Sequence, residues 1–139
     1  MREAFLKANP KLAVLIDEVK RQAARGYLVG LDGRKLWMRR NEDGEVMAHK
    51  ALNTLLQAAG AIVMKWAMVY LDQAVKHHKL RAWKVIDMHD EGQWECHPSD
   101  VDKLKQLMSE CVRKAGEHLG LNCPLASDAV HGANWYETH

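Results

Sequence analysis

Hydrophobic residues recur with a helical period in three stretches of the chain. The first period predicts a helix over residues 10–25, with Pro10 suited to its first turn. A longer helix is predicted from about residue 49 to residue 77. A third is expected between Ser99, a candidate N-cap, and Gly120, a natural stop. The apolar positions that carry the three periods are Leu12, Leu15, Ile16 and Val19; Leu52, Leu55, Leu56, Ala59, Ile62, Val63, Trp66 and Val69; and Leu104, Leu107, Met108, Cys111, Val112, Ala115 and Leu119.

Between these periods the pattern changes to short β-prone segments. Residues 26–40, GYLVGLDGRKLWMRR, contain an Asp-Gly pair between two such runs, which is a strong hairpin signal. Residues 83–88 and 93–96 predict a second hairpin around a polar turn, and 121–125 predicts a brief strand. The expected fold class is α+β, an antiparallel β-hairpin sheet packed against two to three helices.

Several positions carry more specific expectations. In the returning strand of the second hairpin, alternation directs Trp94 and Cys96 to one face of the sheet. Trp66 and Trp83 are expected in the core and not as base-stacking platforms. Gly60 lowers helix propensity in the middle of the long helix, so we expect another segment to pack close to the backbone there.

Length, charge and cysteine content narrow the class of protein. The 139 residues suit a single unit, and 20 Lys and Arg against 18 Asp and Glu leave a net charge of +2, too small to attract nucleic acid by itself. The three cysteines are widely spaced and predict reduced packing residues, not a disulfide framework. No apolar run approaches the roughly 20 residues of a membrane span, and the polar start lacks the core of a signal peptide. We therefore expect a cytoplasmic chain without a membrane partner.

The second hairpin carries His89, Asp90 and Glu91 at its predicted turn, residues 89–92. Adjacent carboxylates are common in solvent-exposed turns. Carboxylates on a tight turn are also placed rigidly enough to bind a divalent metal ion, because Mg²⁺ prefers hard oxygen ligands. The residues alone leave both interpretations open.

Five segments in order resemble a known family: FLKANPKLAVL, GLDGRKLWMRR, HKALNTLLQAAGAIVMKWAMV, the H-D-E at residues 89–91, and GANWYETH. They are similar to the carboxy-terminal part of a family A DNA polymerase of the DNA polymerase I group, phage type. The resemblance implies a partial polymerase palm with an adjoining fingers helix. Residues 1–25 would be the fingers-derived helix and 26–139 the palm, within one unit of residues 1–139.

The resemblance also implies roles for the turn residues, since H-D-E matches motif C of the family. Asp90 would bind catalytic Mg²⁺, Glu91 would support the metal site and the primer end, and His89 would lie near the primer terminus. Nucleotidyl transfer uses two ions, which activate the primer hydroxyl and stabilise the leaving pyrophosphate. This chain would supply only part of that site. Gly92 stands where relatives place an apolar residue, which is expected to loosen the second strand.

The long helix matches the family segment that contacts primer-template DNA. Asn53 and Gln57 are four residues apart and share a helical face, and their amides suit the acceptors of the minor groove. The alternative is an ordinary polar stripe on an amphipathic helix. His49 matches a histidine of phage members and is expected to contact DNA. Arg34 and neighbouring basic residues of the first hairpin could touch phosphate, although such residues are common on hairpins without a ligand.

The segments that complete a polymerase active site have no match in these residues. Motif A and the nucleotide-binding fingers helix are missing, as are the thumb and exonuclease regions. The leading hypothesis is therefore a carboxy-terminal polymerase piece that is inactive alone and works with a larger polymerase chain, in the host cytoplasm if phage-encoded. One alternative is a non-catalytic relic palm that binds DNA or a polymerase. Another is an unrelated α+β interaction domain in which H-D-E is ordinary turn chemistry.

Overall fold

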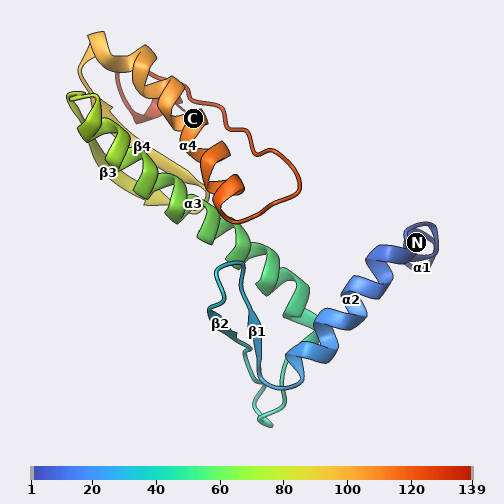
Figure 1. Cartoon of the computed structure of the whole chain (residues 1–139). Coiled ribbons are helices and arrows are strands. Elements are labelled where there is room, and N and C mark those ends of the chain that lie inside the picture. The colour runs from blue at the N-terminus through green and yellow to red at the C-terminus, as the bar shows by residue number, and fades with distance from the viewer. Residues whose placement is uncertain (1, 139) are drawn as a thin grey trace. The chain divides into compact units, whose positions relative to one another are not determined.

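The computed structural model describes residues 2–138, with side chains from residue 4 onward. The chain forms two compact units, Met1–Ala59 and Gly60–His139. Each unit contains one two-stranded antiparallel sheet together with helices (Figure 1). The predicted α+β class is confirmed, and the two hairpins form two separate sheets.

The first unit begins with two helices separated at a single residue. Asn9 leaves the helical region at φ −127° because Pro10 follows it. The predicted helix is confirmed and ends two residues earlier than expected, with Gly26 in the left-handed region at φ +96°. The elements of this unit are α1 (Arg2–Ala8), α2 (Pro10–Ala23), β1 (Tyr27–Val29), β2 (Lys35–Trp37), the 3₁₀ turn η1 (Ala48–Lys50) and the start of α3 (Ala51–His77).

The core of the first unit lies between α2, one face of the β1–β2 hairpin and the beginning of α3. Strand alternation places Leu28 on the inner face, where it is 1% exposed, and its cross-strand partner Leu36 packs beside it. The same buried cluster contains Val19, Ala23 and Ala51. The opposite face of the same short hairpin is left to solvent.

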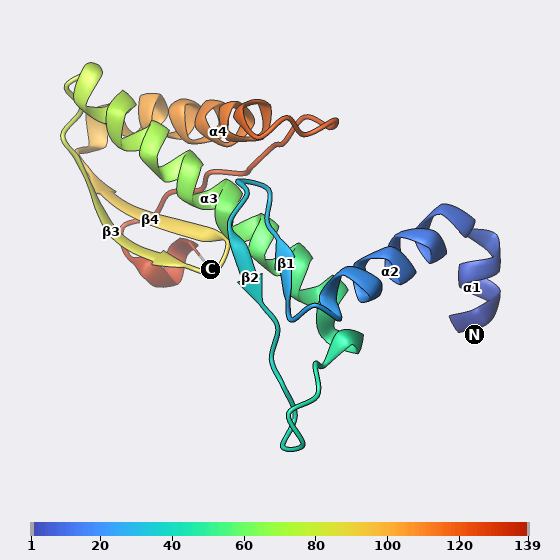
Figure 2. The same cartoon turned by 60° about the horizontal axis from the view of Figure 1, so that its bottom comes forward.

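The second unit contains the rest of α3, a longer hairpin and a second long helix. Figure 2 shows α3 and α4 side by side with the hairpin next to them, and their shared apolar cluster agrees with that view. The elements are β3 (Ala82–Met88), β4 (Glu91–Cys96), the 3₁₀ turn η2 (Pro98–Asp100), α4 (Val101–His118) and the 3₁₀ turn η3 (Trp135–Thr138).

The core of the second unit follows the helical period predicted for residues 99–120, whereas in α3 it includes Leu71 and Val75, which were not predicted, and leaves the predicted Val69 46% exposed. One cluster joins α3, α4 and the base of the hairpin, and it contains Leu71, Leu107 and the buried Cys111. Trp94 and Cys96 of β4 pack against it, which confirms the face predicted for them. A second cluster between α3 and α4 is covered by segment 119–125. Burial raises the pKa of the Cys111 thiol, whereas Cys123 is exposed and therefore is not a packing residue.

Ser99 does not cap α4 as predicted. Residues 98–100 form a 3₁₀ turn, so that Asp100 takes the N-cap position. The Ser99 hydroxyl donates to Asp100 Oδ1 at 2.8 Å and accepts from Arg81 Nη2 at 2.7 Å. Asp100 also accepts from the backbone N–H of Arg81 at 3.0 Å, and this bond is the largest of the causes that lower its pKa to about 2. The two residues thus tie the start of α4 to the start of the second hairpin.

Three other expectations are wrong. Residues 121–125 form no strand, because Leu125 instead packs onto Gly116 of α4 and Pro124 offers no N–H for a ladder. Trp83 is 61% exposed, because the α3 residues with which it lines a hollow, among them Asp72 and Lys76, cover only part of its side chain. Nothing in residues 2–138 packs within 4 Å of a Cβ built at Gly60. Trp66, by contrast, is partly buried in the α3–α4 cluster, where its ring lies 4.1 Å from that of His118.

The stretch Ala48–His77 is long and apolar enough to cross a membrane by length and composition. This differs from the expectation that no segment approaches that limit. Core helices of soluble proteins share the property. In this helix the exposed apolar residues include Leu56 and Val69.

Candidate active site at the β3–β4 turn

The second hairpin ends in a very tight turn. Met88 pairs with Glu91, so only His89 and Asp90 lie outside the ladder, and the predicted four-residue turn is in fact two residues long. His89 adopts φ +53°, a conformation that two-residue hairpin turns require. Because the turn has only two residues, it fixes the backbone positions of Asp90 and Glu91 at little entropic cost.

The two carboxylates of the turn have different surroundings. Asp90 is exposed, and within residues 2–138 it forms no ion pair. Glu91 is half-buried, and its Oε1 accepts a hydrogen bond from the Gln93 side-chain amide. One carboxylate is thus held by its own strand while the other is available to a cation from solution.

A cavity of about 650 Å³ lies between α3 and the hairpin. Met68 and Trp94 supply part of its apolar wall, and His89 and Glu91 line it at the end nearest the turn. Asp87 also lines it and forms an ion pair with Lys84 at 2.7 Å. The sequence analysis did not single out Asp87, although its position two residues before His89 in a strand was a usable signal.

Gly92 sits in β4 opposite Asp87 and does not break the strand pairing. A Cβ built at Gly92 would lie 2.9 Å from Met68 Sδ and 3.0 Å from Met68 Cε. The missing side chain is therefore replaced by the Met68 thioether from α3. The expectation of a loosened strand is wrong, because the strand continues through Gly92 to Cys96.

The donor set of the turn suits only part of a magnesium site. Carboxylate oxygens are the ligands that Mg²⁺ prefers, and Asp90 and Glu91 offer two of them. A two-ion centre requires further ligands on a facing element. No group of three His, Cys, Asp or Glu side chains in the part of the chain that the structure describes is close enough to hold a metal ion.

The predicted DNA-contacting residues of the long helix lie in the first unit. His49 is in η1, and Asn53 and Gln57 occupy the first turns of α3; all three side chains are exposed. Asn53 and Gln57 are one helical turn apart and share a face, as the spacing predicted. That these amides meet the same primer end as Asp90, which belongs to the second unit, stays a prediction.

Arg34 already has a partner in its own hairpin. Its guanidinium lies 2.6 Å from Asp32 Oδ2, and Nε donates to the same oxygen at 2.8 Å. The side-chain hydrogen bond between them lowers the pKa of Asp32 and raises that of Arg34. A DNA phosphate at Arg34 would therefore compete with this pair, and the predicted contact stays a prediction.

Comparison with known proteins places the chain in a family. The model of DNA polymerase family A matches residues 1–137. The DNA-directed DNA polymerase of Escherichia phage Phieco32 is 57% identical over the whole of this chain, and that of Enterobacteria phage T3 is 30% identical. The chain therefore belongs to DNA polymerase family A.

The same comparisons show how much of a polymerase these residues represent. The chain covers 23% of the Phieco32 polymerase and 22% of the T3 polymerase. The polymerase domain of Pol1 from M. smegmatis, solved in complex with a DNA primer-template and dNTP, superimposes with a TM-score of 0.72 at 28% identity. That match covers 82% of this chain and 21% of the Pol1 chain. The chain spans about a quarter or less of the relatives it matches.

Proposed function

We propose that this chain supplies the carboxy-terminal palm region of a DNA-directed DNA polymerase, including one side of its Mg²⁺ site. Asp90 binds a catalytic Mg²⁺, Glu91 supports the metal site and the primer end, and His89 lies beside the primer terminus. Residues 26–139 act as palm and residues 1–25 as a fingers-derived helix. The activity belongs to DNA replication in the cytoplasm, that of the host if the chain is phage-encoded.

The tight β3–β4 turn is the observation that carries this proposal. It places an exposed Asp90, which has no ion-pair partner within residues 2–138, next to a Glu91 that its own strand already holds. An ordinary polar turn, such as that of the first hairpin, neutralises its aspartate locally. An aspartate kept without an ion-pair partner on a two-residue turn is suited to a cation that comes from outside the hairpin.

The primer-template DNA is proposed to bind along the start of α3. Asn53 and Gln57 would hydrogen-bond to minor-groove acceptors of the newly formed base pairs, and their amides can both donate and accept. His49 and Arg34 would contact the DNA backbone. These contacts position the duplex, while the metal site performs the chemistry.

A larger polymerase chain is the proposed partner, since the facing metal ligands of motif A and the nucleotide-binding helix must come from elsewhere. Two features of the second unit support such a partner. Trp83, Val85 and Met88 of β3 are apolar and exposed. The apolar wall of the cavity, to which Met68 and Trp94 contribute, is a second surface on which a segment of the partner would pack.

Primer extension tests the proposal. The chain is mixed with the larger part of the Phieco32 polymerase, and Mg²⁺-dependent nucleotide incorporation is measured. We expect no incorporation by the chain alone, activity in the mixture, and a loss of more than about hundredfold with Asp90→Ala. A direct metal ligand should matter more than an outer-shell partner, whose loss costs roughly 10- to 100-fold.

Asp43→Ala is the matched control, because Asp43 is an exposed aspartate in a turn of the first unit. It should leave extension unchanged. Full activity of the Asp90→Ala mixture would remove Asp90 from the metal site. If no mixture is active but the chain still binds primer-template, the non-catalytic palm relic becomes the better description.

A further inference from the structure

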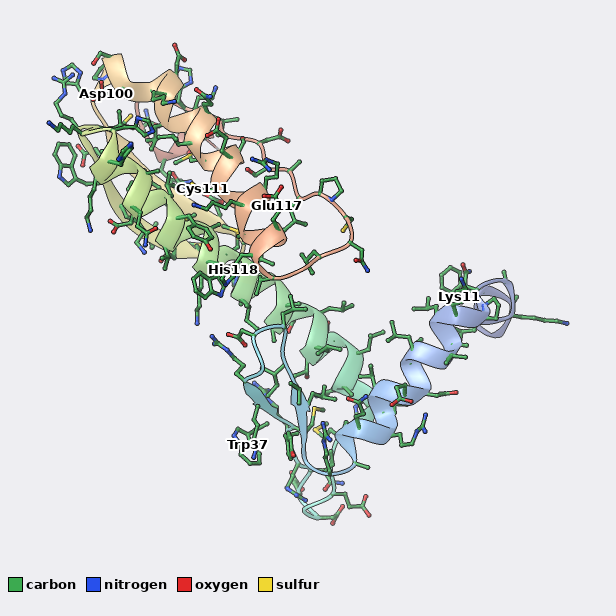
Figure 3. The ribbon with its side chains drawn as sticks, viewed as in Figure 1. Lys11, Trp37, Asp100, Cys111, Glu117 and His118 are labelled. Atoms are coloured by element: carbon green, nitrogen blue, oxygen red, sulfur yellow. The ribbon has the colours of Figure 1, made fainter. Side chains whose placement is uncertain are left out.

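The outer face of the first hairpin carries two aromatic rings that the polymerase proposal does not use. Tyr27 and Trp37 are cross-strand partners in β1 and β2, and their ring centroids lie 5.6 Å apart at an interplanar angle of 60°. Trp37 is 71% exposed, and Figure 3 shows its side chain projecting outward from β2. The exposed Trp37 indole therefore leaves a substantial apolar surface of this small hairpin in contact with water.

Cations surround these rings. Lys35 Nζ lies 4.8 Å from the Tyr27 ring centroid and 5.9 Å from that of Trp37. Arg25 Cζ lies 4.5 Å from the Tyr27 centroid. The acidic side chain of this hairpin, Asp32, is already bound by Arg34 at the turn. The outer face therefore combines flat π-surfaces with positive charge that its own hairpin does not neutralise.

This combination fits one class of ligand best. Proteins that bind single-stranded nucleic acid stack bases on aromatic side chains and follow the backbone with basic residues. The Lys35 side chain is exposed and flexible, so its ammonium can move to a phosphate while a base takes the ring face. Arg25 Nε donates to the Tyr27 carbonyl at 3.3 Å, and the other guanidinium N–H groups can donate to a phosphate. A folded protein partner could also bury these rings, but it would need acidic groups spaced to match Lys35 and Arg25, whereas a single strand carries a phosphate beside every base.

We propose that Arg25, Tyr27, Lys35 and Trp37 form a stacking site for unpaired DNA bases, separate from the metal-binding turn. Trp37 stacks on a base, and Lys35 and Arg25 contact the flanking phosphates. The inference rests on the proposed function in taking DNA as the ligand. It adds a contact to the unpaired strand that the amides of α3, which face paired DNA, do not provide.

Binding of a fluorescently labelled oligothymidylate to the full chain tests this site, with anisotropy as the readout. We expect Trp37→Ala to weaken binding roughly tenfold, within the range found for loss of one base-aromatic stack. Trp37→Phe, which keeps a ring, should lose less. Lys35→Gln should lower the slope of log affinity against log salt by about 0.7, the value for one phosphate contact on a single strand.

Trp83→Ala is the matched control. Trp83 is also exposed, at 61%, but lies on β3 of the second unit, and no cation-π contact involves it within residues 2–138. It should bind the oligonucleotide as the unmodified chain does. Circular dichroism should show both tryptophan variants folded, since neither side chain is in the core.

Three results would overturn the stacking site: unchanged affinity in Trp37→Ala, an equal loss in Trp83→Ala, or a Trp37→Ala chain that fails to associate with the larger polymerase while binding oligothymidylate normally. Asp90→Ala separates this inference from the proposed function. It should bind the oligonucleotide normally even though it abolishes extension, so either proposal can fail without the other.

Discussion

The two hairpins of this molecule use an aspartate at their turns in opposite ways. In the first, five residues connect β1 to β2, and Asp32 is held by the guanidinium of Arg34. In the second, two residues connect β3 to β4, and Asp90 has no ion-pair partner in the described part of the chain. The sequence pattern is similar at both turns, but only the second leaves a carboxylate available. A charged turn is a candidate binding site when no neighbouring side chain of opposite charge pairs with its carboxylate.

The hairpins also differ in what covers their inner faces. The first packs on α2 and the start of α3 around Leu28, whereas the second packs on α3 and α4 around Leu71. Each core belongs to one of the two units. If the units are energetically separate, damage to one core should leave the other hairpin intact.

Truncation of the two core leucines tests this separation and should give the largest stability effects. Leu28 is 1% exposed and Leu71 is fully buried, so each change to Ala should cost about 2–5 kcal/mol of unfolding free energy. Hydrogen exchange locates the damage. Leu28→Ala should reduce amide protection in β1 and β2, and Leu71→Ala in β3 and β4. Equal loss of protection in both hairpins after either change would mean that the units unfold as one.

Acid should affect the second unit through Asp100. Hydrogen bonds from the Arg81 backbone and side chain lower the pKa of Asp100 from 3.8 to about 2. A depressed pKa means that the folded state prefers the ionised carboxylate, so this stabilisation is complete above about pH 4 and is lost as the pH falls toward 2. The melting temperature of the chain should therefore fall over that pH interval. Asp100→Asn should make the melting temperature depend less on pH there.

Asp32 gives the comparison for that experiment. Its pKa is also lowered, chiefly by the side-chain hydrogen bond from Arg34, but the pair stabilises only an exposed turn. Asp32→Asn should leave most of the acid dependence in place. If Asp32→Asn reduced the pH dependence of the melting temperature more than Asp100→Asn does, acid would not be acting through the bonds between Arg81 and Asp100.

The sequence predicted the positions of the helices well, but it predicted less well which residues pack against one another and which are exposed. The helical period of Leu104 to Leu119 located α4 because that helix buries one stripe. The period of Leu12 to Val19 located α2 as well, although Leu15 is 46% exposed and only the C-terminal part of α2 is buried. The strand character of residues 121–125 was misleading, since Leu125 found a better contact on Gly116 than on a sheet edge. Trp83 was misplaced for a related reason. Its hydrophobicity is evident from the sequence, but whether this chain provides a cover for it is not.

In the candidate site, too, the local turn could be predicted from the sequence, whereas the contacts around it could not. The β3–β4 turn was predicted over residues 89–92 and found at 89–90, because local strand and turn preferences determine its place in the chain. The cavity beside it depends on Met68, a residue about twenty positions earlier, and Asp87 faces that cavity through a pairing register that sequence alone does not fix. The cations around Trp37 also depend on the register, since Lys35 and Tyr27 approach each other only once β1 and β2 pair.

Two glycines, one in each hairpin, should show the smallest effects and distinguish strain from crowding. Gly33 has φ +82° and open space around its Cβ position, so Gly33→Ala should cost about 1 kcal/mol through the left-handed backbone alone. Gly92 has no such conformation, and an added methyl would instead meet the end of the Met68 side chain. Because methionine is flexible, Gly92→Ala should cost less than about 1 kcal/mol, measured by urea unfolding.

The double variant of Gly92→Ala with Met68→Ala should be more stable than the sum of the single changes implies, whereas the effects of Gly33→Ala and Met68→Ala should be additive. Additivity at Gly92 would mean that the Met68 contact does not determine what this position tolerates.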